Sequence, residues 1–242
     1  MRTTHVVHHA LMPLIACVAA ITIGCSSSSD PAEQSFEIYT ELESAAGVPI
    51  RHSGEIQVED DGEFADSVRV DSVRVLFSRL VLHRSKDDTT EGPRKVKAGP
   101  FVLTWSARGM RRDLGADIEA GVFRRMKLEM HKFSGSEATM YSDNPIFRDF
   151  TTGKRSTMIV DGVVFVDGKA EPFRVSSERT GNVFVEFDPP VEVTEAGTQG
   201  IVMSMDMIAS LRVTGGIRNP RLPKALEAIE AGIWSNTKIR KR

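Results

Sequence analysis

Short apolar runs with a two-residue alternation dominate the chain from residue 36 to residue 213. Alternation of this kind places apolar side chains on one face of a strand, and the Gly, Pro, Asp and Asn residues between the runs favour turns. The pattern predicts strands at Ser35–Leu42, Gly54–Glu59, Ser67–Val70, Ser72–His83, Pro100–Trp105, Phe123–Phe133, Ser156–Val160, Val163–Val166, Glu171–Ser176, Asn182–Phe187 and Gly200–Ile208. Many short strands with few helical signals indicate an all-β antiparallel sandwich or barrel.

Methionines form a stripe in the last of these predicted strands. Met203, Met205 and Met207 alternate with Ser204 and Asp206, so the three thioethers share one face. Thioethers bind soft metals, but they are also flexible apolar side chains that fill irregular cores. We interpret the stripe as core packing.

Three local patterns refine the strand prediction. Asp167-Gly168 lies between two apolar runs and predicts a hairpin turn. The valine alternation shifts phase at Asp71-Ser72, which indicates a bulge or a short turn. In the segment 183–187, Phe184 falls on the face opposite the other apolar residues, and we expect another part of the protein to cover it.

The pattern changes to a helical period near the C-terminus. In Leu222–Trp234, Leu226, Ile229 and Ile233 fall on one helical face, and Pro223 suits a first turn. The basic residues 238–242 are expected to be a solvated tail, with contact to anionic lipid or another envelope polymer as the alternative.

The N-terminal residues have the layout of a secretory signal peptide. Residues 1–9 hold Arg2 and three histidines, and residues 10–24 form an uncharged apolar run that ends on a small residue. That run is shorter than a bilayer-spanning helix, which argues against the alternative of a retained transmembrane anchor. We therefore expect residues 1–24 to be a cleaved signal peptide.

The segment 21–25, Ile-Thr-Ile-Gly-Cys, resembles a lipobox, in which the cysteine receives a lipid before cleavage in front of it. Cys25 is the predicted lipidation site. Residues 14–17 also fit the pattern, but cleavage at Cys17 would leave a stunted apolar region before it. Four serines follow Cys25 and suit a flexible spacer. A serine directly after the lipidated cysteine goes with delivery to the outer membrane of Gram-negative bacteria.

Composition excludes several classes of function. The formal net charge is −2, which gives no global signature of nucleic-acid binding. Cys17 and Cys25 are the two cysteines, so a chain cleaved before Cys25 has no second thiol for a disulfide. Cysteine-based zinc sites, iron–sulfur clusters and cysteine nucleophiles are excluded in the same way.

Candidate chemistry beyond the anchor is sparse. The sequence lacks a Gly-x-Ser-x-Gly elbow, a phosphate-binding glycine loop, a His-Glu-x-x-His pair and a dinucleotide fingerprint. His52, His83 and His131 lie on separate segments, without the spacing of metal ligands. The acidic run Glu59–Glu63 lacks the alternating spacing of a calcium loop. We expect Trp105 to lie in the core, and we predict no cofactor.

The serial order of several motifs resembles an uncharacterised family of bacterial lipoproteins with a domain of unknown function. The resemblance runs from residue 53 to about residue 215, through the valine-rich strand 73–83, Gly99-Pro100, Leu114-Gly115, the strand start at 120–128 and the segment 203–206. It implies a single sandwich of transthyretin- or immunoglobulin-like type, with residues 143–154 as a long internal loop. It implies no catalytic residues.

Together these observations predict an all-β protein, an antiparallel β-sandwich with a short C-terminal α-helix. The expected divisions are a signal peptide (1–24), a lipidated cysteine with a serine-rich tether (25–34), the sandwich (35–215), and a helix with a basic tail (216–242). The expected function is a non-enzymatic binding or structural module, anchored in the cell envelope, with an envelope protein or glycan as partner. The alternatives are a carbohydrate hydrolase that uses a spatial pair of carboxylates, or a metal-binding envelope protein.

Overall fold

The computed structural model describes residues 35–43, 50–51, 64–89, 92–194 and 198–242. Residues 31–242 form a compact unit of their own. The predicted signal peptide, Cys25 and the serine-rich tether lie outside the described residues, as do His52, the predicted strand Gly54–Glu59 and the acidic run Glu59–Glu63. Predictions on these segments stay predictions.

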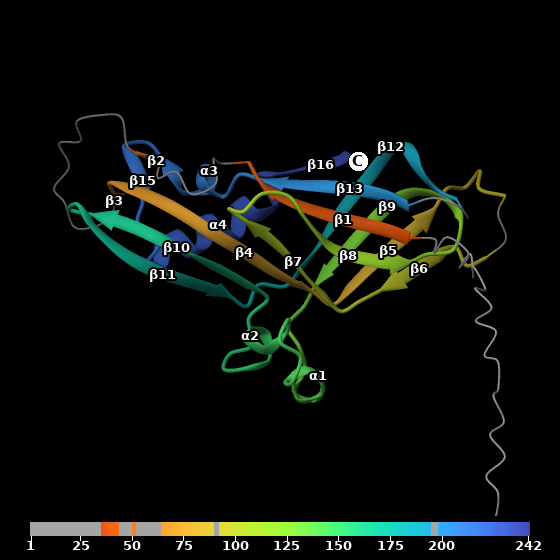
Figure 1. Ribbon diagram of the computed structural model, residues 1–242, viewed down its shortest axis with the longest axis horizontal. Coiled ribbons are helices and arrows are strands. Elements are labelled where there is room, and N and C mark those ends of the chain that lie inside the picture. The colour runs from red at the N-terminus through yellow and green to blue at the C-terminus, as the bar shows by residue number, and fades with distance from the viewer. Residues whose placement is uncertain (1–34, 44–49, 52–63, 90–91, 195–197) are drawn as a thin grey trace, which may run out of the picture. The chain divides into compact units, whose positions relative to one another are not determined.

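One wall of the sandwich contains two sheets. Each strand of one sheet is followed along the chain by a strand of the other sheet, or follows one. β4 (Ser67–Phe77) is followed across Ser78 by β5 (Arg79–Arg84), and β6 (Lys95–Ala98) is followed by β7 (Phe101–Ser106). The other two pairs are β9 (Gly121–Met130) with β10 (Met158–Val166), and β11 (Lys169–Ser177) with β12 (Gly181–Val193). Both sheets therefore have the same order, β7-β4-β10-β11 and β6-β5-β9-β12 (Figure 1).

The opposite wall is a sheet of order β16-β13-β1-β8. Its strands are β1 (Ser35–Leu42), β8 (Arg111–Asp117), β13 (Thr198–Met205) and β16 (Thr237–Lys241). β1 and β13 run parallel, whereas the other ladders among the described residues are antiparallel. β2 (Ile50–Arg51) pairs with the start of β4, and β14 (Arg212–Val213), β15 (Gly216–Arg218) and β3 (Phe64–Ala65) form a small third sheet.

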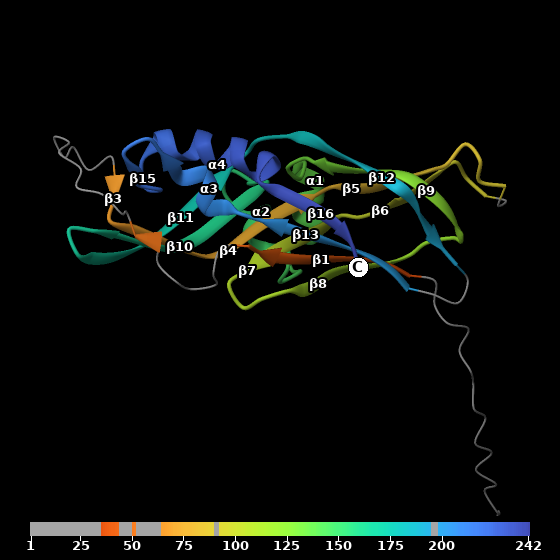
Figure 2. The ribbon, with the colours of Figure 1, turned by 90° about the horizontal axis from the view of Figure 1, so that it is seen from above.

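Two helices complete this unit near the C-terminus. α3 (Met207–Leu211) and α4 (Pro223–Ser235) pack against each other, and α4 also contacts β11 (Figure 2). Leu222 is the N-cap of α4 and Pro223 is its first residue, while Ile229 and Ile233 are buried on its inner face. The predicted C-terminal helix is confirmed, because its apolar stripe is packed against the rest of the unit.

The main apolar cluster fills the space between the two walls. Its largest fully buried side chains include Trp105, Phe36, Phe77 and Phe123. The Trp105 indole donates a hydrogen bond of 2.9 Å to the Met203 carbonyl, which connects β7 with β13 of the opposite sheet. The protein is an all-β sandwich, as the strand pattern predicts. Every buried residue of its apolar clusters lies between Phe36 and Ile233, so residues 31–242 carry this core within themselves.

The predictions of the Asp167-Gly168 turn, the bulge near Asp71 and the buried methionine stripe are confirmed. Asp167 and Gly168 join β10 to β11 with φ angles of 51° and 70°, a left-handed conformation in which glycine carries no penalty. The ladder between β10 and β4 shifts register across Asp71, which is a bulge. Met203, Met205 and Met207 are at most 1% exposed and belong to the main cluster.

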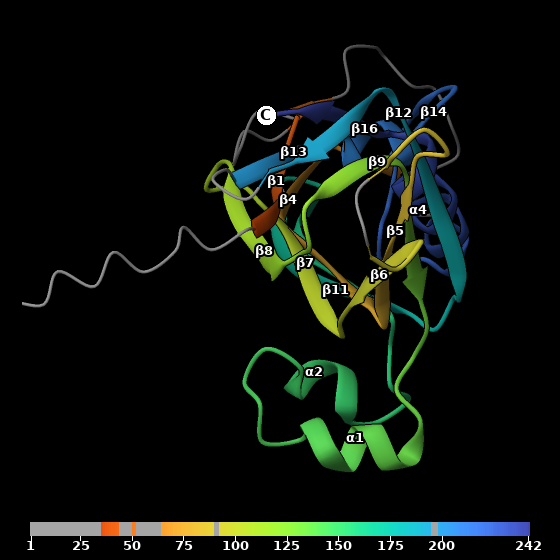
Figure 3. The same cartoon turned by 90° about the vertical axis from the view of Figure 1, so that its right-hand side faces the viewer.

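The expected long loop 143–154 contains a short helix, and a second helix precedes it within residues 131–157. These helices are α1 (Gly135–Tyr141) and α2 (Arg148–Thr151), which stand apart from the sheets in Figure 3. We call residues 133–151 the lobe. Phe133, Ala138, Phe147 and Phe150 of the lobe pack on Leu76, Val102 and Ile159 and form a second apolar cluster. The lobe thus covers the outer face of the sheet that contains β4, β7 and β10.

The sequence predicts a solvated basic tail at residues 238–242, but residues 237–241 form the edge strand β16 on β13. Lys238 pairs with Glu43 at 2.8 Å, and Arg240 pairs with Glu41 at 3.2 Å. Lys241 donates to the carbonyls of Pro189 and Pro190. The segment is therefore an edge strand whose basic side chains have partners within the domain.

Candidate functional site

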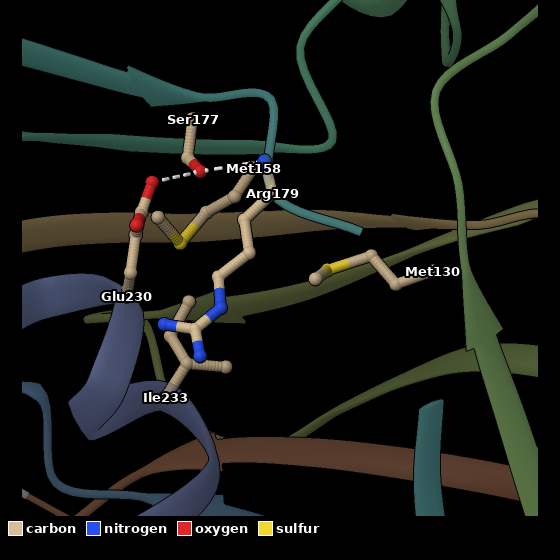
Figure 4. A pocket seen from close by; sticks show the side chains of 6 residues that line it. All are labelled: Met130, Met158, Ser177, Arg179, Glu230 and Ile233. Atoms are coloured by element: carbon tan, nitrogen blue, oxygen red, sulfur yellow. Dashed lines mark hydrogen bonds between the residues drawn. The ribbon is translucent and has the colours of Figure 1, made fainter. Parts of the chain in front are cut away.

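An open groove of about 580 Å³ lies beside α4, where β11 ends. Its floor continues into a small pocket behind Ser177 (Figure 4). The groove is lined by hydroxyl groups, by both signs of charge and by one leucine: Lys154, Ser156, Ser176, Ser177, Glu178, Arg179, Leu226 and Glu230. The pocket behind it, between Met130, Met158 and Ile233, has a volume of about 10 Å³ and can hold no more than one water molecule.

Ser177 is the residue that joins the groove to α4. Its hydroxyl donates to the Glu230 carboxylate and accepts a hydrogen bond of 3.0 Å from the backbone N–H of Arg179. Thr157 Oγ1 lies 2.7 Å from the Arg179 carbonyl and fixes the turn that follows β11. Ser177 is 3% exposed. These two hydrogen bonds hold the end of β11 against α4, and the burial of Ser177 keeps its hydroxyl away from the open part of the groove.

The charged side chains of the groove are more accessible than Ser177. Lys154, Glu178 and Arg179 are exposed, and Glu230 is half-buried. Arg179, Glu230 and Ile233 all line the small pocket shown in Figure 4. The groove therefore offers hydrogen-bond donors and acceptors of both charges to a polar ligand.

Two carboxylates, Glu178 and Glu230, line the same groove, which is the arrangement that a carbohydrate hydrolase would need. One of the pair in such an enzyme acts as an acid and needs a raised pKa. Lys132 donates to Glu178 at 2.8 Å and lowers the pKa of that carboxyl from 4.5, and Lys154 and Arg155 add to the effect. Glu178 is thus held in the charged form. No histidine lines the groove among the described residues.

A second candidate surface is the outer face of β6, β5, β9 and β12, the strands at the right of Figure 1. Directly paired residues of an antiparallel sheet share a face, so the strand registers place one set of side chains together. We call this set the Phe184 face. It consists of Arg79, Val81, His83, Lys95, Lys97, Arg125, Lys127, Glu129, Asn182, Phe184 and Glu186.

Phe184 stands out on this face because it is 58% exposed. The expectation that another part of the protein covers it is wrong. The Arg125 guanidinium carbon lies 6.0 Å from the ring centre, and Lys127 Nζ lies 5.8 Å from it. The two cations accompany the ring, but they leave more than half of it open.

The rest of the Phe184 face is mostly cationic. Lys127 and Glu129 pair at 2.8 Å, and Arg79 lies 3.5 Å from Glu129. Burial lowers the pKa of His83 below 6.5, and the cations of Lys95, Arg125, Arg124 and Lys127 lower it further. His83 is therefore neutral at neutral pH, and the positive charge of the face comes from its lysines and arginines.

The structure places the other predicted site residues apart from these surfaces or outside the described part. Cys25 and His52 are not among the described residues. His83 lies on β5 and His131 follows β9, and the described residues contain no group of three or more His, Cys, Asp or Glu side chains that could hold a metal. Sequence reasoning missed the groove, because its lining comes from residues 154–156, 176–179 and 226–230, which are distant along the chain.

The described residues thus define a β-sandwich with a polar groove and a cationic face. None of its described helices is both long and apolar enough to cross a membrane. Comparisons with protein-family models, with curated proteins and with solved structures gave no match.

Proposed function

We propose that the chain is a lipid-anchored protein of the cell envelope, exported by residues 1–24 and attached through Cys25 to the outer membrane of a Gram-negative bacterium. The proposal is supported by the apolar run 10–24, by the lipobox-like segment 21–25 and by the serine-rich spacer behind it. The resemblance to an uncharacterised lipoprotein family supports the same location.

Replacing the anchor cysteine tests this location. A Cys25→Ser chain, produced in a Gram-negative host, should lose incorporation of a labelled fatty acid and move from the membrane to the soluble fraction. A Cys17→Ser chain is the matched control and should keep both properties. Full labelling of the Cys25→Ser chain would contradict the assignment and move the anchor to Cys17.

The sandwich itself is, in this proposal, a non-enzymatic binding module, and the groove beside α4 is its ligand site. The observation that carries this is the lining of the groove, which offers charges of both signs and hydroxyl groups to a ligand, while Ser177 is buried between Glu230 and the Arg179 N–H. A ligand with carboxylates, amines and sugar hydroxyls matches the lining. A fragment of peptidoglycan has all three groups, so we propose an envelope glycan of this kind.

Titration of soluble peptidoglycan fragments into residues 31–242 tests the ligand site. Arg179→Gln and Glu230→Gln should each weaken binding about tenfold or more, since a hydrogen bond to a charged group contributes about 1.5–3 kcal/mol. Lys169→Gln changes an exposed charge on β11 outside the groove and should leave affinity unchanged. Equal affinity of all four proteins would remove the groove from the proposal.

The same fragments test the hydrolase alternative, which the presence of Glu178 and Glu230 in one groove favours. Release of reducing ends by the unmodified protein, abolished in Glu178→Gln, would establish an enzyme. The proposed binding module predicts no release. The remaining alternative, a metal site that involves Glu59–Glu63 or the histidines, is tested by elemental analysis of the purified protein.

A further inference from the structure

The Phe184 face carries an excess of positive charge on a chain whose formal net charge is −2. Its cations are Arg79, Lys95, Lys97, Arg125 and Lys127, and its acids are Glu129 and Glu186. The acids pair with Arg79, Lys127 and Arg125. Lys95 and Lys97 are exposed, and no ion pair involves them within the described part of the chain. The Phe184 face therefore carries more positive than negative charge, and two of its lysines have no ion-pair partner among the described residues.

The open ring of Phe184 lies within this cationic surface and not apart from it. Val81, its neighbour two strands away, is only 5% exposed between the longer side chains of the same row. The face is thus a broad sheet surface with one protruding aromatic ring. Aromatic rings that lie among lysines and arginines suit the boundary between headgroups and acyl chains, where the ring loses water and the cations meet phosphates.

The point at which the chain enters the sandwich allows this face to reach a bilayer. The nine residues 26–34 separate Cys25 from β1 and span at most about 30 Å when extended. Ser35, the first residue of β1, pairs with Asp117 and Thr198. Those residues follow Val193 of β12 and precede Gly121 of β9 by a few positions, so β1 begins near the Val193–Gly121 end of the ladder that also contains the Phe184–Lys127 pair.

We propose that the Phe184 face docks on an anionic phospholipid surface, with Phe184 inserted at the headgroup level and Lys95 and Lys97 over the phosphates. The bilayer is the one that holds the lipid on Cys25, so this inference rests on the proposed anchor. Juxtamembrane cations each contribute about a fivefold gain in partition to an anionic surface. The face is a second attachment that orients the sandwich on the membrane, whereas the lipid sets only its distance.

Residues 31–242 without lipid test the docking, because they contain the core of the sandwich and lack Cys25. The protein is sedimented with vesicles of phosphatidylcholine alone and with vesicles of equal parts phosphatidylcholine and phosphatidylglycerol. We expect binding to the anionic vesicles only, weakened by added salt. Lys95→Gln combined with Lys97→Gln should lower partition about 25-fold, and Phe184→Ser should lower it about tenfold.

Matched controls lie elsewhere on the surface. Arg108→Gln combined with Lys169→Gln removes two exposed charges, and Met140→Ser removes an apolar side chain that is 71% exposed on the lobe. Both controls should bind as the unmodified protein does. Absence of binding to anionic vesicles, or binding that the face variants do not weaken, would overturn the proposal.

A soluble polyanion distinguishes a membrane from an anionic polymer as the occupant. Polyphosphate should compete for the lysines only weakly, because it offers no apolar layer to Phe184. Tight binding of polyphosphate that Phe184→Ser leaves unchanged would overturn docking on a bilayer in favour of a polymer site. Failure of the lipid-free protein to bind anionic vesicles, together with lipid labelling at Cys25 of the full chain, would contradict the docking proposal alone. The two proposals can therefore be tested independently.

Discussion

Asp113 on β8 shows how a single buried carboxylate joins three strands. Its side chain is 1% exposed, and Oδ2 accepts a hydrogen bond of 2.6 Å from the backbone N–H of Thr104 on β7. Thr40 Oγ1 on β1 also lies 2.6 Å from Oδ2, and Arg111 Nε lies 2.5 Å from Oδ1. Burial raises the pKa of Asp113 above 3.8, although Thr40, Thr104 and Arg111 act in the opposite direction.

This raised pKa predicts a pH dependence of stability. The folded state holds the Asp113 proton more tightly than the unfolded chain, so the stability from this group is lost as pH rises from about 3.8 through the raised value. Asp113→Asn removes the titration and keeps an acceptor for Thr104. As pH increases from acidic to neutral, the unmodified protein loses the stability that comes from this group and the variant does not. The free energy of unfolding of the variant minus that of the unmodified protein should therefore increase over this range.

Denaturant unfolding of residues 31–242 at a series of pH values measures this difference. Asp113→Ala is the comparison variant, because it leaves the Thr104 N–H without its acceptor and should cost about 1–3 kcal/mol throughout the range. Parallel stability profiles for Asp113→Asn and the unmodified protein would show that the carboxyl group titrates alike in the folded and unfolded states.

At the scale of single residues, the sequence predicts a local feature correctly where that feature depends on backbone geometry. Asp167-Gly168 and the bulge at Asp71 are read from the sequence because a tight turn needs positive φ, and because an extra residue shifts the alternation. The alternation pattern correctly places Phe184 on the polar face of its strand, but the expectation that another part of the protein covers it is wrong. Phe184 shares a face with Glu186 in the sequence pattern, and the structure leaves it in the open as that pattern indicates.

Among the secondary-structure elements, α1 carries a local signal that hydrophobic periodicity overlooks. Ser134 caps the helix through the backbone N–H of Glu137, and the Glu137 side chain accepts from the backbone N–H of Ser134. This is a capping box, in which a serine is followed three residues later by a glutamate. The motif predicts a helix start from sequence alone, although α1 has only seven residues.

β8 and β16 lack such a signal. β8 has the sequence RRDLGAD and β16 has TKIRK, so each offers few apolar residues to an alternation pattern. Both are the outer strands of their sheet, where one backbone edge and many side chains face away from the core. Their strand conformation comes from pairing with β1 and β13, which are distant in sequence, and local propensity does not reveal it.

For the whole molecule, the sequence predicts the class of fold but not the surfaces that carry the proposed function. The all-β sandwich follows from patterning, because each buried strand needs an apolar face. The groove joins β11, the turn after it and α4, and the Phe184 face joins four strands from three separate segments. Both depend on strand order, which alternation along the chain leaves undetermined.

The two apolar clusters predict two levels of stability within the unit. Phe147 packs edge-on against Phe133 and Tyr141, with ring centres 5.5 and 5.1 Å apart. These contacts lie in the lobe, which is joined to the sheets through Leu76, Val102 and Ile159 and through the ion pairs of Asp149 with Arg74 and Arg174. Regions with a small core of their own open locally at a lower free energy than the whole protein. The lobe should therefore open before the sandwich unfolds.

Phe147→Ala tests this, because truncation of a buried phenylalanine costs about 3–5 kcal/mol at its own site. Amide hydrogen exchange should accelerate across residues 134–151, while the strands of the main cluster keep their protection and the unfolding midpoint changes little. Leu128→Ala, in the main cluster, should lower the midpoint and accelerate exchange in both regions. If Phe147→Ala lowered protection in β4 and β9 as much as in α1, the lobe and the sandwich would unfold as one cooperative unit, which would contradict the two levels of stability.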